Sequence, residues 1–283
     1  MNIREVRKKI KSSTNVKKIT KALEMVSAIK MRKAQSEAIE ARVYQTNLEE
    51  IIKKLAAKAD PKLSLLLQTQ KDAIDRTLSI VISTNKGLCG SYNFNLYRFI
   101  IKNSQVKNSD FIVIGKKGGL FINSIGGQVI ADFADNQPLA NVSAIFQLVI
   151  DGFTKKKYNK VNVYYNKFIS TLKNEPIAET ILPVTYKQEE SFIKEKIEEF
   201  LIEPDPRVLI NQLLNSYVEE KIRDCLIQAI AGEHSSRMIA MKNATENAND
   251  VIYNLTLLRN KIRQEKITYE LLDMMTAKES VES

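Results

Sequence analysis

Glycine and proline are scarce in this chain of 283 residues, with 9 and 6 copies, and tryptophan is absent. Because both residues interrupt helices, their scarcity favours long, uninterrupted helices. Aromatic residues make up only 7% of the sequence, whereas charged residues make up 27%. A chain so lean in aromatic side chains does not suit one large compact core, and the composition indicates an extended protein.

Histidine and cysteine are also nearly absent. His234 is the single histidine, which excludes histidine-dependent catalytic triads and multi-histidine metal sites. Cys89 and Cys225 are too few for a disulfide framework or a metal-binding cluster, and they predict two buried free thiols in a reducing compartment. Adjacent carboxylates such as Glu219 and Glu220 would point in different directions on a helix. The sequence therefore predicts no catalytic residue, no cofactor and no metal ligand.

No apolar run approaches the roughly 20 residues that a membrane-spanning helix needs, and Met1 is followed by charged residues without an apolar signal core. We therefore expect a soluble or membrane-peripheral protein. The formal net charge is +10, and residues 1–33 hold eleven Lys or Arg but only two Glu. A basic segment of this density predicts contact with nucleic acid, an anionic membrane or an acidic protein surface, unless it is only a solvated face.

Two long helices are predicted at the ends of the chain. Residues 2–60 contain neither glycine nor proline, and Pro61 then ends the stretch. From Pro206 to the end, only Gly232 interrupts. Apolar and small residues in both segments recur in steps of three and four, the heptad pattern of a coiled coil. The predicted seam comprises Val16, Ile19, Leu23, Val26, Ala34, Ala38, Ala41, Tyr44, Leu48, Ile51 and Leu55, with Met241, Ala244, Ala248, Val251, Leu255, Leu258, Ile262, Tyr269 and Leu272.

Between these helices the pattern changes to short apolar runs separated by turn residues. Strands are predicted at 77–84, 110–115, 128–133 and 161–170, with an edge strand at 177–184 bracketed by Pro176 and Pro183. Helices are predicted at 93–102, 117–123 and 142–156. This alternation predicts a parallel-leaning, Rossmann-like α/β domain. The expected organisation is a coiled-coil helix at 1–60, the α/β domain at 61–205 and a second coiled-coil helix with a projecting tip at 206–283.

Connection geometry determines how the two helices pair. Both leave the same domain, so they must pack antiparallel, with residue i opposite roughly residue 266 − i. About 20 residues at the C-terminal end then have no partner within the chain. This projecting tip carries Leu271, Leu272, Met274 and Met275, and exposed apolar side chains on a single helix predict a partner.

The glycine-rich turns are candidates for phosphate-binding loops, because strand-to-helix loops are where α/β domains bind nucleotides. The segments 87–90 (GLCG) and 115–119 (GKKGG) fit neither G-x-G-x-x-G nor G-x-x-x-x-G-K-[ST]. We therefore expect them to be structural turns.

Four separated motifs resemble the gamma subunit of rotary (F-type) ATP synthases of the bacterial type. They are ITKALEMVSAIKMRKAQ at 19–35, NKGLCG at 85–90, EPDP at 203–206, and RMIAMKNA at 237–244 with NKIRQEKITYE at 260–270. The motifs occur in the family's order and cover nearly the whole chain.

The resemblance implies the central rotor stalk of ATP synthase, a non-catalytic subunit. The coiled coil would sit inside a ring of alpha and beta subunits, and the α/β domain would dock on the membrane ring of c subunits with the epsilon subunit. Proton flow would turn this rotor, and the catalytic beta subunits would respond to it. The implied location is the cytoplasmic face of the bacterial plasma (inner) membrane, peripheral to the bilayer, with no nucleic-acid partner and no cofactor.

Site residues follow from the same resemblance. Contacts with the alpha and beta subunits are expected along the shaft and at its tip, and Glu203 is expected near the membrane ring. The expected alpha and beta contacts are Leu23, Lys30, Arg237, Arg263, Gln264, Thr268, Glu270, Leu271, Leu272 and Met275.

The sequence departs from the family pattern at three places. Leu23 stands where methionine is common, and Glu265-Lys266 replaces small residues after the Arg-Gln pair. The polar end at 277–283 (AKESVES) replaces small apolar residues.

Two other readings remain open from the residues alone. One is a basic coiled-coil protein that binds nucleic acid or anionic membrane through residues 1–33, although no aromatic side chain for base stacking occurs before Tyr44. The other is a nucleotide-binding enzyme.

Overall fold

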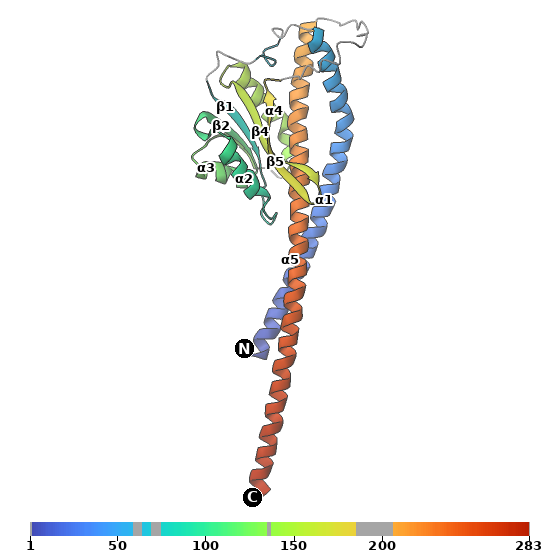
Figure 1. The fold of residues 1–283 in the computed structure, drawn as a ribbon, viewed down its shortest axis with the longest axis vertical. Coiled ribbons are helices and arrows are strands. Elements are labelled where there is room, and N and C mark those ends of the chain that lie inside the picture. The colour runs from blue at the N-terminus through green and yellow to red at the C-terminus, as the bar shows by residue number, and fades with distance from the viewer. Residues whose placement is uncertain (1, 59–63, 69–74, 135–136, 185–205, 283) are drawn as a thin grey trace. The chain divides into compact units, whose positions relative to one another are not determined.

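A computed structural model describes residues 2–58, 64–68, 75–134, 137–184 and 206–282 (Figure 1). The two terminal helices are confirmed. Helix α1 spans Ile3–Lys58 and helix α5 spans Pro206–Glu282, with 56 and 77 residues. Both are continuous within these bounds, and α5 passes through Gly232 without a break.

The central segment forms one five-stranded sheet with the order β3-β2-β1-β4-β5. The first four strands of this order are parallel, and β5 is antiparallel at the edge. A parallel order of 3-2-1-4 is that of a Rossmann-like half, so the predicted fold is confirmed. The strands are β1 Thr77–Ile82, β2 Ser109–Ile114, β3 Gln128–Phe133, β4 Lys160–Ser170 and β5 Lys173–Leu182.

Strand β5 differs from its prediction. It begins at Lys173 and contains Pro176, which the sequence had placed outside the strand. Pro176 pairs with Asn166 on β4, and its other side is the open edge of the sheet. Proline is tolerated there because an edge strand has no second neighbour that needs an N–H donor. Strands β4 and β5 consequently form a long hairpin that turns at Thr171 and Leu172.

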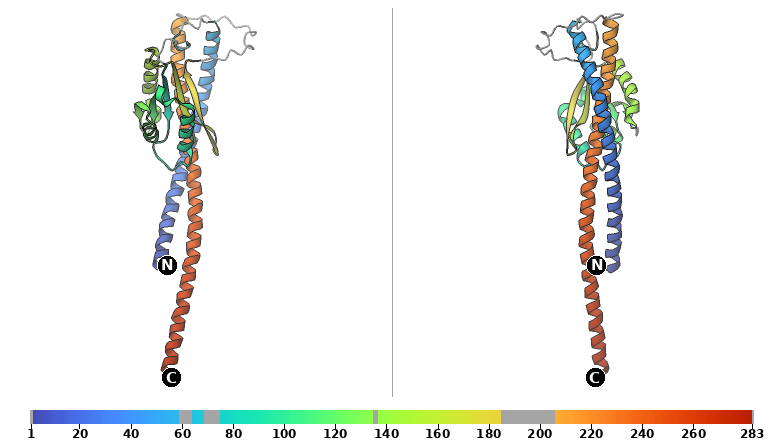
Figure 2. Two further views of the ribbon diagram at one scale, coloured as in Figure 1. Left: turned by 60° about the vertical axis from the view of Figure 1, so that its left-hand side comes forward. Right: turned by 90° about the vertical axis from the view of Figure 1, so that its right-hand side faces the viewer.

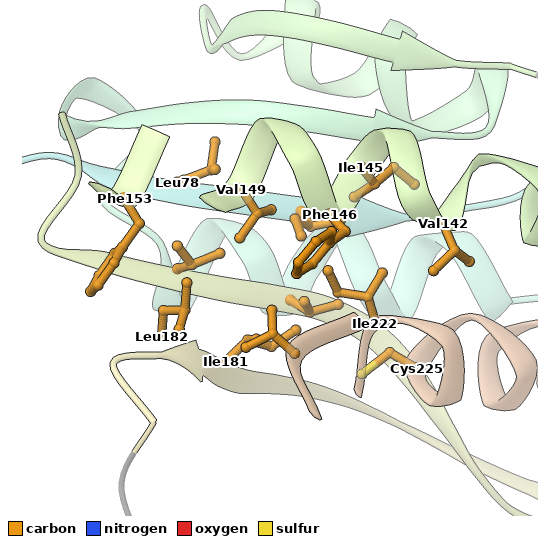
Figure 3. Close-up of a cluster of buried hydrophobic side chains, with 14 of the residues drawn as sticks. Leu78, Val142, Ile145, Phe146, Val149, Phe153, Ile181, Leu182, Ile222 and Cys225 are labelled. Atoms are coloured by element: carbon orange, nitrogen blue, oxygen red, sulfur yellow. The ribbon is translucent and has the colours of Figure 1, made fainter. Parts of the chain in front are cut away.

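Helices cover both faces of the sheet. Helices α2 (Tyr92–Asn103) and α3 (Lys116–Ser124) pack on one face, where Leu96, Ile100 and Ile122 are fully buried. Helix α4 (Val142–Thr154) packs on the other face together with part of α5 (Figure 3). Two short 3-10 helices, η2 (Val106–Asn108) and η3 (Pro138–Asn141), connect these elements.

Helix α5 supplies a strip of the domain core. Its buried side chains recur about every turn, and α1 adds Leu48 and Ile52 to the same cluster. Burying one Leu or Ile side chain contributes about 1.5–3 kcal/mol, so this strip anchors the helix to the domain. The buried residues of α5 in this cluster are Ile210, Leu214, Val218, Ile222, Cys225, Leu226 and Ala229.

The chain divides into two compact units. One comprises residues 28–236, and the other comprises residues 1–27 with 237–283. Within the second unit α1 and α5 lie side by side (Figure 2). Thr20 lies opposite Thr245 there, one position from the register that the connection geometry predicts, so the antiparallel pairing is confirmed.

The predicted seam of this helix pair is wrong in part. Val16, Ile19 and Val26 are 49%, 59% and 49% exposed. The buried positions here are instead Val6 and two residues with small polar side chains, Thr20 and Ser27. The apolar residues of α1 predict one face as the seam. The two helices instead pack through the neighbouring face, where the side chains are smaller.

The same offset recurs elsewhere. On α5, Met241 and Ala248 are buried as predicted, whereas Val251 and Leu258 are exposed. In the unit of residues 28–236, Ala34 and Leu48 are buried as predicted, but Tyr44 and Ile51 are exposed. Leu55 lies outside the described side chains.

Candidate functional site: partner-contact surfaces and the hairpin on α5

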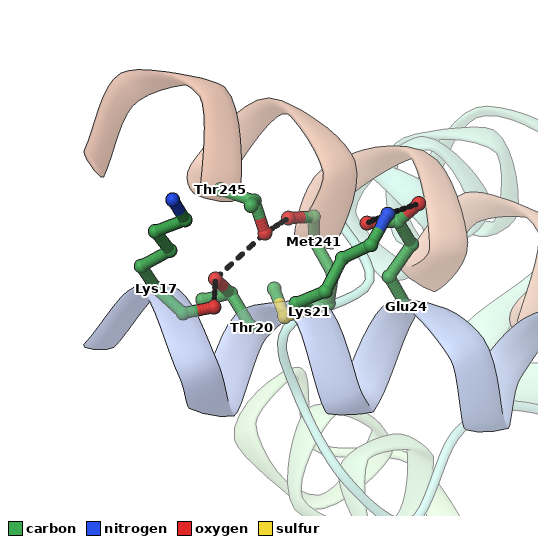
Figure 4. Close-up of polar contacts among 6 residues, drawn as sticks. All are labelled: Lys17, Thr20, Lys21, Glu24, Met241 and Thr245. Atoms are coloured by element: carbon green, nitrogen blue, oxygen red, sulfur yellow. Dashed lines mark hydrogen bonds and ion pairs between the residues drawn. The ribbon is translucent and has the colours of Figure 1, made fainter. Parts of the chain in front are cut away.

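The seam of the helix pair contains a pair of hydroxyl groups. Thr20 Oγ1 and Thr245 Oγ1 are 2.7 Å apart, and both residues are only 8% exposed (Figure 4). Each hydroxyl also lies within hydrogen-bond distance of a carbonyl of its own helix, Lys17 O at 3.1 Å and Met241 O at 2.8 Å. Two protons can make only two of these three contacts at once. One hydroxyl donates across the seam, and the other accepts that bond while it donates to the carbonyl of its own helix.

The basic segment presents its charges to solvent. All eleven Lys and Arg side chains of residues 1–33 are exposed. Two of them form ion pairs on the same helix, Lys21 with Glu24 at 3.0 Å and Lys33 with Glu37 at 3.9 Å. Exposed pairs of this kind contribute little to stability, so the segment retains a strongly positive surface.

Apolar side chains lie on the same helix outside the seam. Val16, Ile19, Met25, Val26 and Ile29 are all about half exposed or more. Single exposed apolar residues are normal, but five within fourteen positions form a surface that suits burial against another protein. The sequence missed this surface because three of these residues, Val16, Ile19 and Val26, satisfied the heptad pattern and were predicted to lie in the seam.

No described part of the chain covers the C-terminal tip. Every residue from Arg263 to Ala277 is exposed. This set includes the predicted contact residues Gln264, Thr268, Glu270, Leu271, Leu272 and Met275. The Thr268 hydroxyl donates to Gln264 O at 3.0 Å, and Lys266 lies 3.4 Å from Glu270. These local bonds stabilise the helix and leave Arg263 and the apolar side chains available.

The remaining predicted contact residues differ in accessibility. Lys30 is exposed and Leu23 is half-buried. Arg237 is only 8% exposed, so within this chain it is mainly a packed residue. Glu203 lies outside the described residues.

The β4–β5 hairpin lies against α5 inside the α/β domain. Near the end of β5, Glu179 Oε1 is 2.8 Å from Lys221 Nζ, and the Tyr165 hydroxyl donates to Glu179 Oε2 at 2.9 Å. Near the turn, the Asn174 amide donates to Ser236 Oγ at 3.0 Å, and the Ser235 hydroxyl donates to Thr171 O.

Gly232 allows this close approach. A Cβ atom at that position would lie 2.9 Å from Asn174 Oδ1 and 3.3 Å from a ring carbon of Tyr92. The Tyr92 hydroxyl in turn donates to Ala229 O at 2.8 Å. The one glycine of the long helix therefore marks the point where the hairpin and α2 both contact α5.

Electrostatics favour the charged form of the Glu179–Lys221 pair. Burial alone would raise the pKa of Glu179, but the hydrogen bond and charge of Lys221 outweigh it, so the pKa is lowered. Burial alone would lower the pKa of Lys221. The hydrogen bond and negative charge of Glu179 outweigh burial, so the pKa of Lys221 is raised. Burial and nearby acidic groups raise the pKa of the Cys225 thiol and the Tyr165 phenol, so both stay protonated.

The ends of the central strands, where Rossmann-like folds bind nucleotides, are filled by the protein itself. The first amides of α3 donate to the loop after β1: Lys116 N to Asn85 Oδ1 at 3.0 Å, Lys117 N to Thr84 O at 3.1 Å and Gly118 N to Ser83 Oγ at 2.8 Å. An anion binds at a helix N-terminus through such amides, so this one has no free donor to offer. For residues 115–119, these hydrogen bonds agree with the expectation of a structural turn.

Strand β4 extends past the carboxyl end of β1 and contacts the start of α2. It continues well past its last pairing with β1, at Tyr164 and Val81, and the Asn166 amide donates to Tyr92 O at 3.0 Å. Within the described residues, no group of three or more His, Cys, Asp or Glu side chains could hold a metal ion. The same part of the chain contains no helix long and apolar enough to cross a membrane.

Comparison with known proteins decides the family. The ATP synthase family model that matches this chain covers residues 2–281. The ATP synthase gamma chain of Psychrobacter cryohalolentis is 35% identical over 287 aligned positions, covering 97% of each chain. That of a Polaromonas species is 37% identical and covers 98% of this chain and 99% of its own. The chain belongs to the ATP synthase gamma family.

Solved structures support the fold of this gamma-family chain. A rotor chain of the mitochondrial ATP synthase of Euglena gracilis superposes with a TM-score of 0.66 at 19% identity, covering 94% of this chain and 98% of that one. A chain from the central stalk and c-ring of the Tetrahymena thermophila enzyme gives a TM-score of 0.56 at 23% identity, covering 80% of this chain.

Proposed function

We propose that this chain is the central rotor stalk of a bacterial F-type ATP synthase. The observation that carries the proposal is gamma-family similarity along nearly the whole chain, from the basic start of α1 to the exposed tip of α5. The stalk would couple proton flow through the membrane ring to ATP synthesis or hydrolysis in the beta subunits. The catalytic sites belong to those partners, and this chain contributes no catalytic residue.

The paired helices have a physical property that suits this role. Two antiparallel helices have no threefold axis, so inside a ring of three beta subunits they must contact each one differently. A partner's conformational equilibrium changes only when its contacts differ between states. An asymmetric shaft that turns inside the ring would therefore bias each catalytic subunit in sequence.

The exposed surfaces of α1 and α5 are assigned to the head of the enzyme. The eleven basic side chains of residues 1–33 and the apolar group from Val16 to Ile29 would face the beta subunits, together with Leu23, Lys30 and Arg237. Arg263, Gln264, Thr268 and Glu270 would contact loops of the beta subunits. Leu271, Leu272 and Met275 would turn against apolar residues of the alpha and beta subunits.

The α/β domain is assigned to the membrane side. It would bind the epsilon subunit and the ring of c subunits, with Glu203 near the ring. The complex would lie on the cytoplasmic face of the bacterial inner membrane, and this chain would be peripheral to the bilayer.

The test is assembly with partner subunits. We expect alpha and beta subunits from the same organism to form a complex with this chain that hydrolyses ATP, while the isolated chain has no such activity. Replacing Arg263 and Gln264 together by alanine should lower turnover or assembly. ATP hydrolysis by the isolated chain, or failure of the wild-type chain to join the complex, would contradict the proposal.

A further inference from the structure

The β4–β5 hairpin is the part of the α/β domain that runs along α5. Its two groups of polar contacts with the helix lie at Lys221 and at Ser235–Ser236, about 21 Å apart at 1.5 Å per residue. The hairpin residues at these points are Glu179 and Thr171–Asn174, about 20 Å apart along an extended strand. Strand and helix therefore stay aligned over several turns.

Apolar packing and polar bonds hold the hairpin to α5 in different ways. Ile181, Leu182 and Ile222 are fully or almost fully buried in the shared core (Figure 3). Such burial resists separation of the two elements, but the hydrophobic attraction is itself non-directional. Hydrogen bonds and ion pairs add resistance to sliding, because they weaken steeply when their geometry is lost.

The Glu179–Lys221 pair supplies a strong directional bond. Glu179 and Lys221 side chains are 28% and 25% exposed, so solvent screens them only partly. The Tyr165 hydroxyl binds the second carboxylate oxygen and orients it from β4. Charge-assisted bonds of this kind are roughly twice as strong as neutral ones, such as the bonds from Asn174 near the turn.

We propose that Glu179, Lys221 and Tyr165 are positioning residues of the rotor, which fix the hairpin to α5 so that torque on the α/β domain reaches the helix. This inference rests on the proposed function of the chain as a rotor stalk. Breaking the ion pair would let the hairpin shift along the helix under load, and rotation would be transmitted incompletely.

The experiment uses the complete ATP synthase in inverted membrane vesicles and compares ATP-driven proton pumping with ATP hydrolysis at equal content of assembled complex. Glu179→Gln and Lys221→Met should lower pumping per ATP hydrolysed, and Tyr165→Phe should lower it less. The double charge reversal Glu179→Lys with Lys221→Glu should recover part of the loss. Lys173→Gln is the matched control, since it removes an exposed ion pair with Glu175 from the same hairpin.

The outcomes separate the two proposals. A merely structural role would reduce the amount of complex and leave the pumping ratio unchanged, and that result would overturn the inference. Wild-type ratios in Glu179→Gln and Lys221→Met would do the same. Tyr165→Phe removes only one hydroxyl. If a charge variant does not fold, the pumping ratio of Tyr165→Phe still tests the inference. If vesicles with the wild-type chain show no pumping that depends on it, the rotor function itself is wrong.

Discussion

Thr20 and Thr245, 225 positions apart in the sequence, share a hydrogen bond of 2.7 Å at the centre of the helix pair. A polar pair in a coiled-coil seam specifies the register of the helices at some cost in stability. Here the cost is small, because each hydroxyl also has a carbonyl of its own helix within reach. The pair therefore fixes the alignment without leaving a buried group unsatisfied.

Replacing either threonine by valine should cost about 0.5–1.5 kcal/mol of unfolding free energy, because the cross-helix bond is lost and the shape is kept. The double variant should cost less than the sum of the two single variants. Urea unfolding followed by circular dichroism measures all three. Thr268→Val is the matched control, since Thr268 makes the same bond to its own helix but is exposed. Additive single effects would show that the two hydroxyls are not coupled.

The Glu179–Lys221 pair predicts a pH dependence of stability. The pKa of Glu179 is lowered from 4.5, so its contribution is complete above that pH and is lost as the pH falls through the folded-state value. The pKa of Lys221 is raised from 10.5, so its contribution is complete below that pH and is lost at more alkaline pH. Tyr165 and Lys167 of β4 and Cys225 of α5 face the same pair.

We therefore expect wild type to exceed Glu179→Gln in stability by about 1–2 kcal/mol near neutral pH, and the gap to close in acid. Thermal unfolding across the acidic range measures it. Glu175→Gln, which breaks an exposed pair, should show almost no gap at any pH. A gap for Glu179→Gln that stays constant into acid would mean that the charge is not responsible.

Gly232 should not tolerate a branched side chain. Gly232→Val should destabilise the protein by about 1–3 kcal/mol, because its side chain would meet Asn174 and the ring of Tyr92. Gly232→Ala should be closer to neutral, since the gain in helix propensity of about 1 kcal/mol offsets the contact. It should become stabilising when Asn174 is also replaced by alanine. Gly87→Ala is the control, because no atom lies within 4 Å of the added carbon. Unfolding free energies that do not depend on Asn174 would contradict this account.

The tip predicts a separation of stability from assembly. Leu271, Leu272 and Met275 are 57%, 52% and 68% exposed, so their joint replacement by glutamine should change the stability of the isolated chain by less than about 0.5 kcal/mol per site. Assembly with alpha and beta subunits should fall clearly. Leu214→Ala is the contrasting variant: it should lower the stability of the isolated chain by about 2–5 kcal/mol, because Leu214 is fully buried. Normal assembly of the glutamine variant would remove the tip from the partner contacts.

Elements that depend on local signals could be predicted from the sequence. Proline and glycine placement predicted the bounds of α1 and α5 to within about two residues. The alternation of strands and helices predicted a largely parallel sheet, but not the order of its strands. Antiparallel pairing followed from connectivity, and Thr20 with Thr245 lies one position from the expected register.

Contacts that depend on the third dimension could not be predicted. Val16, Ile19 and Val26 satisfied a heptad pattern, yet the helices pack through Thr20 and Ser27, because heptad counting on one helix cannot tell which of two adjacent faces its partner will cover. The Glu179–Lys221 bond joins residues 42 apart from a strand and a helix. Nothing in the local sequence around either residue marks it.

The hydrogen bonds that hold the start of α3 to Ser83, Thr84 and Asn85 have a mechanical consequence. In ligand-binding folds of this type, the ligand occupies the crevice outside the carboxyl ends of the strands. Here hydrogen bonds between the first amides of α3 and the loop after β1 hold that region together. A domain that transmits torque benefits from rigidity. The region where other folds of this type hold a ligand therefore stiffens the domain in this chain.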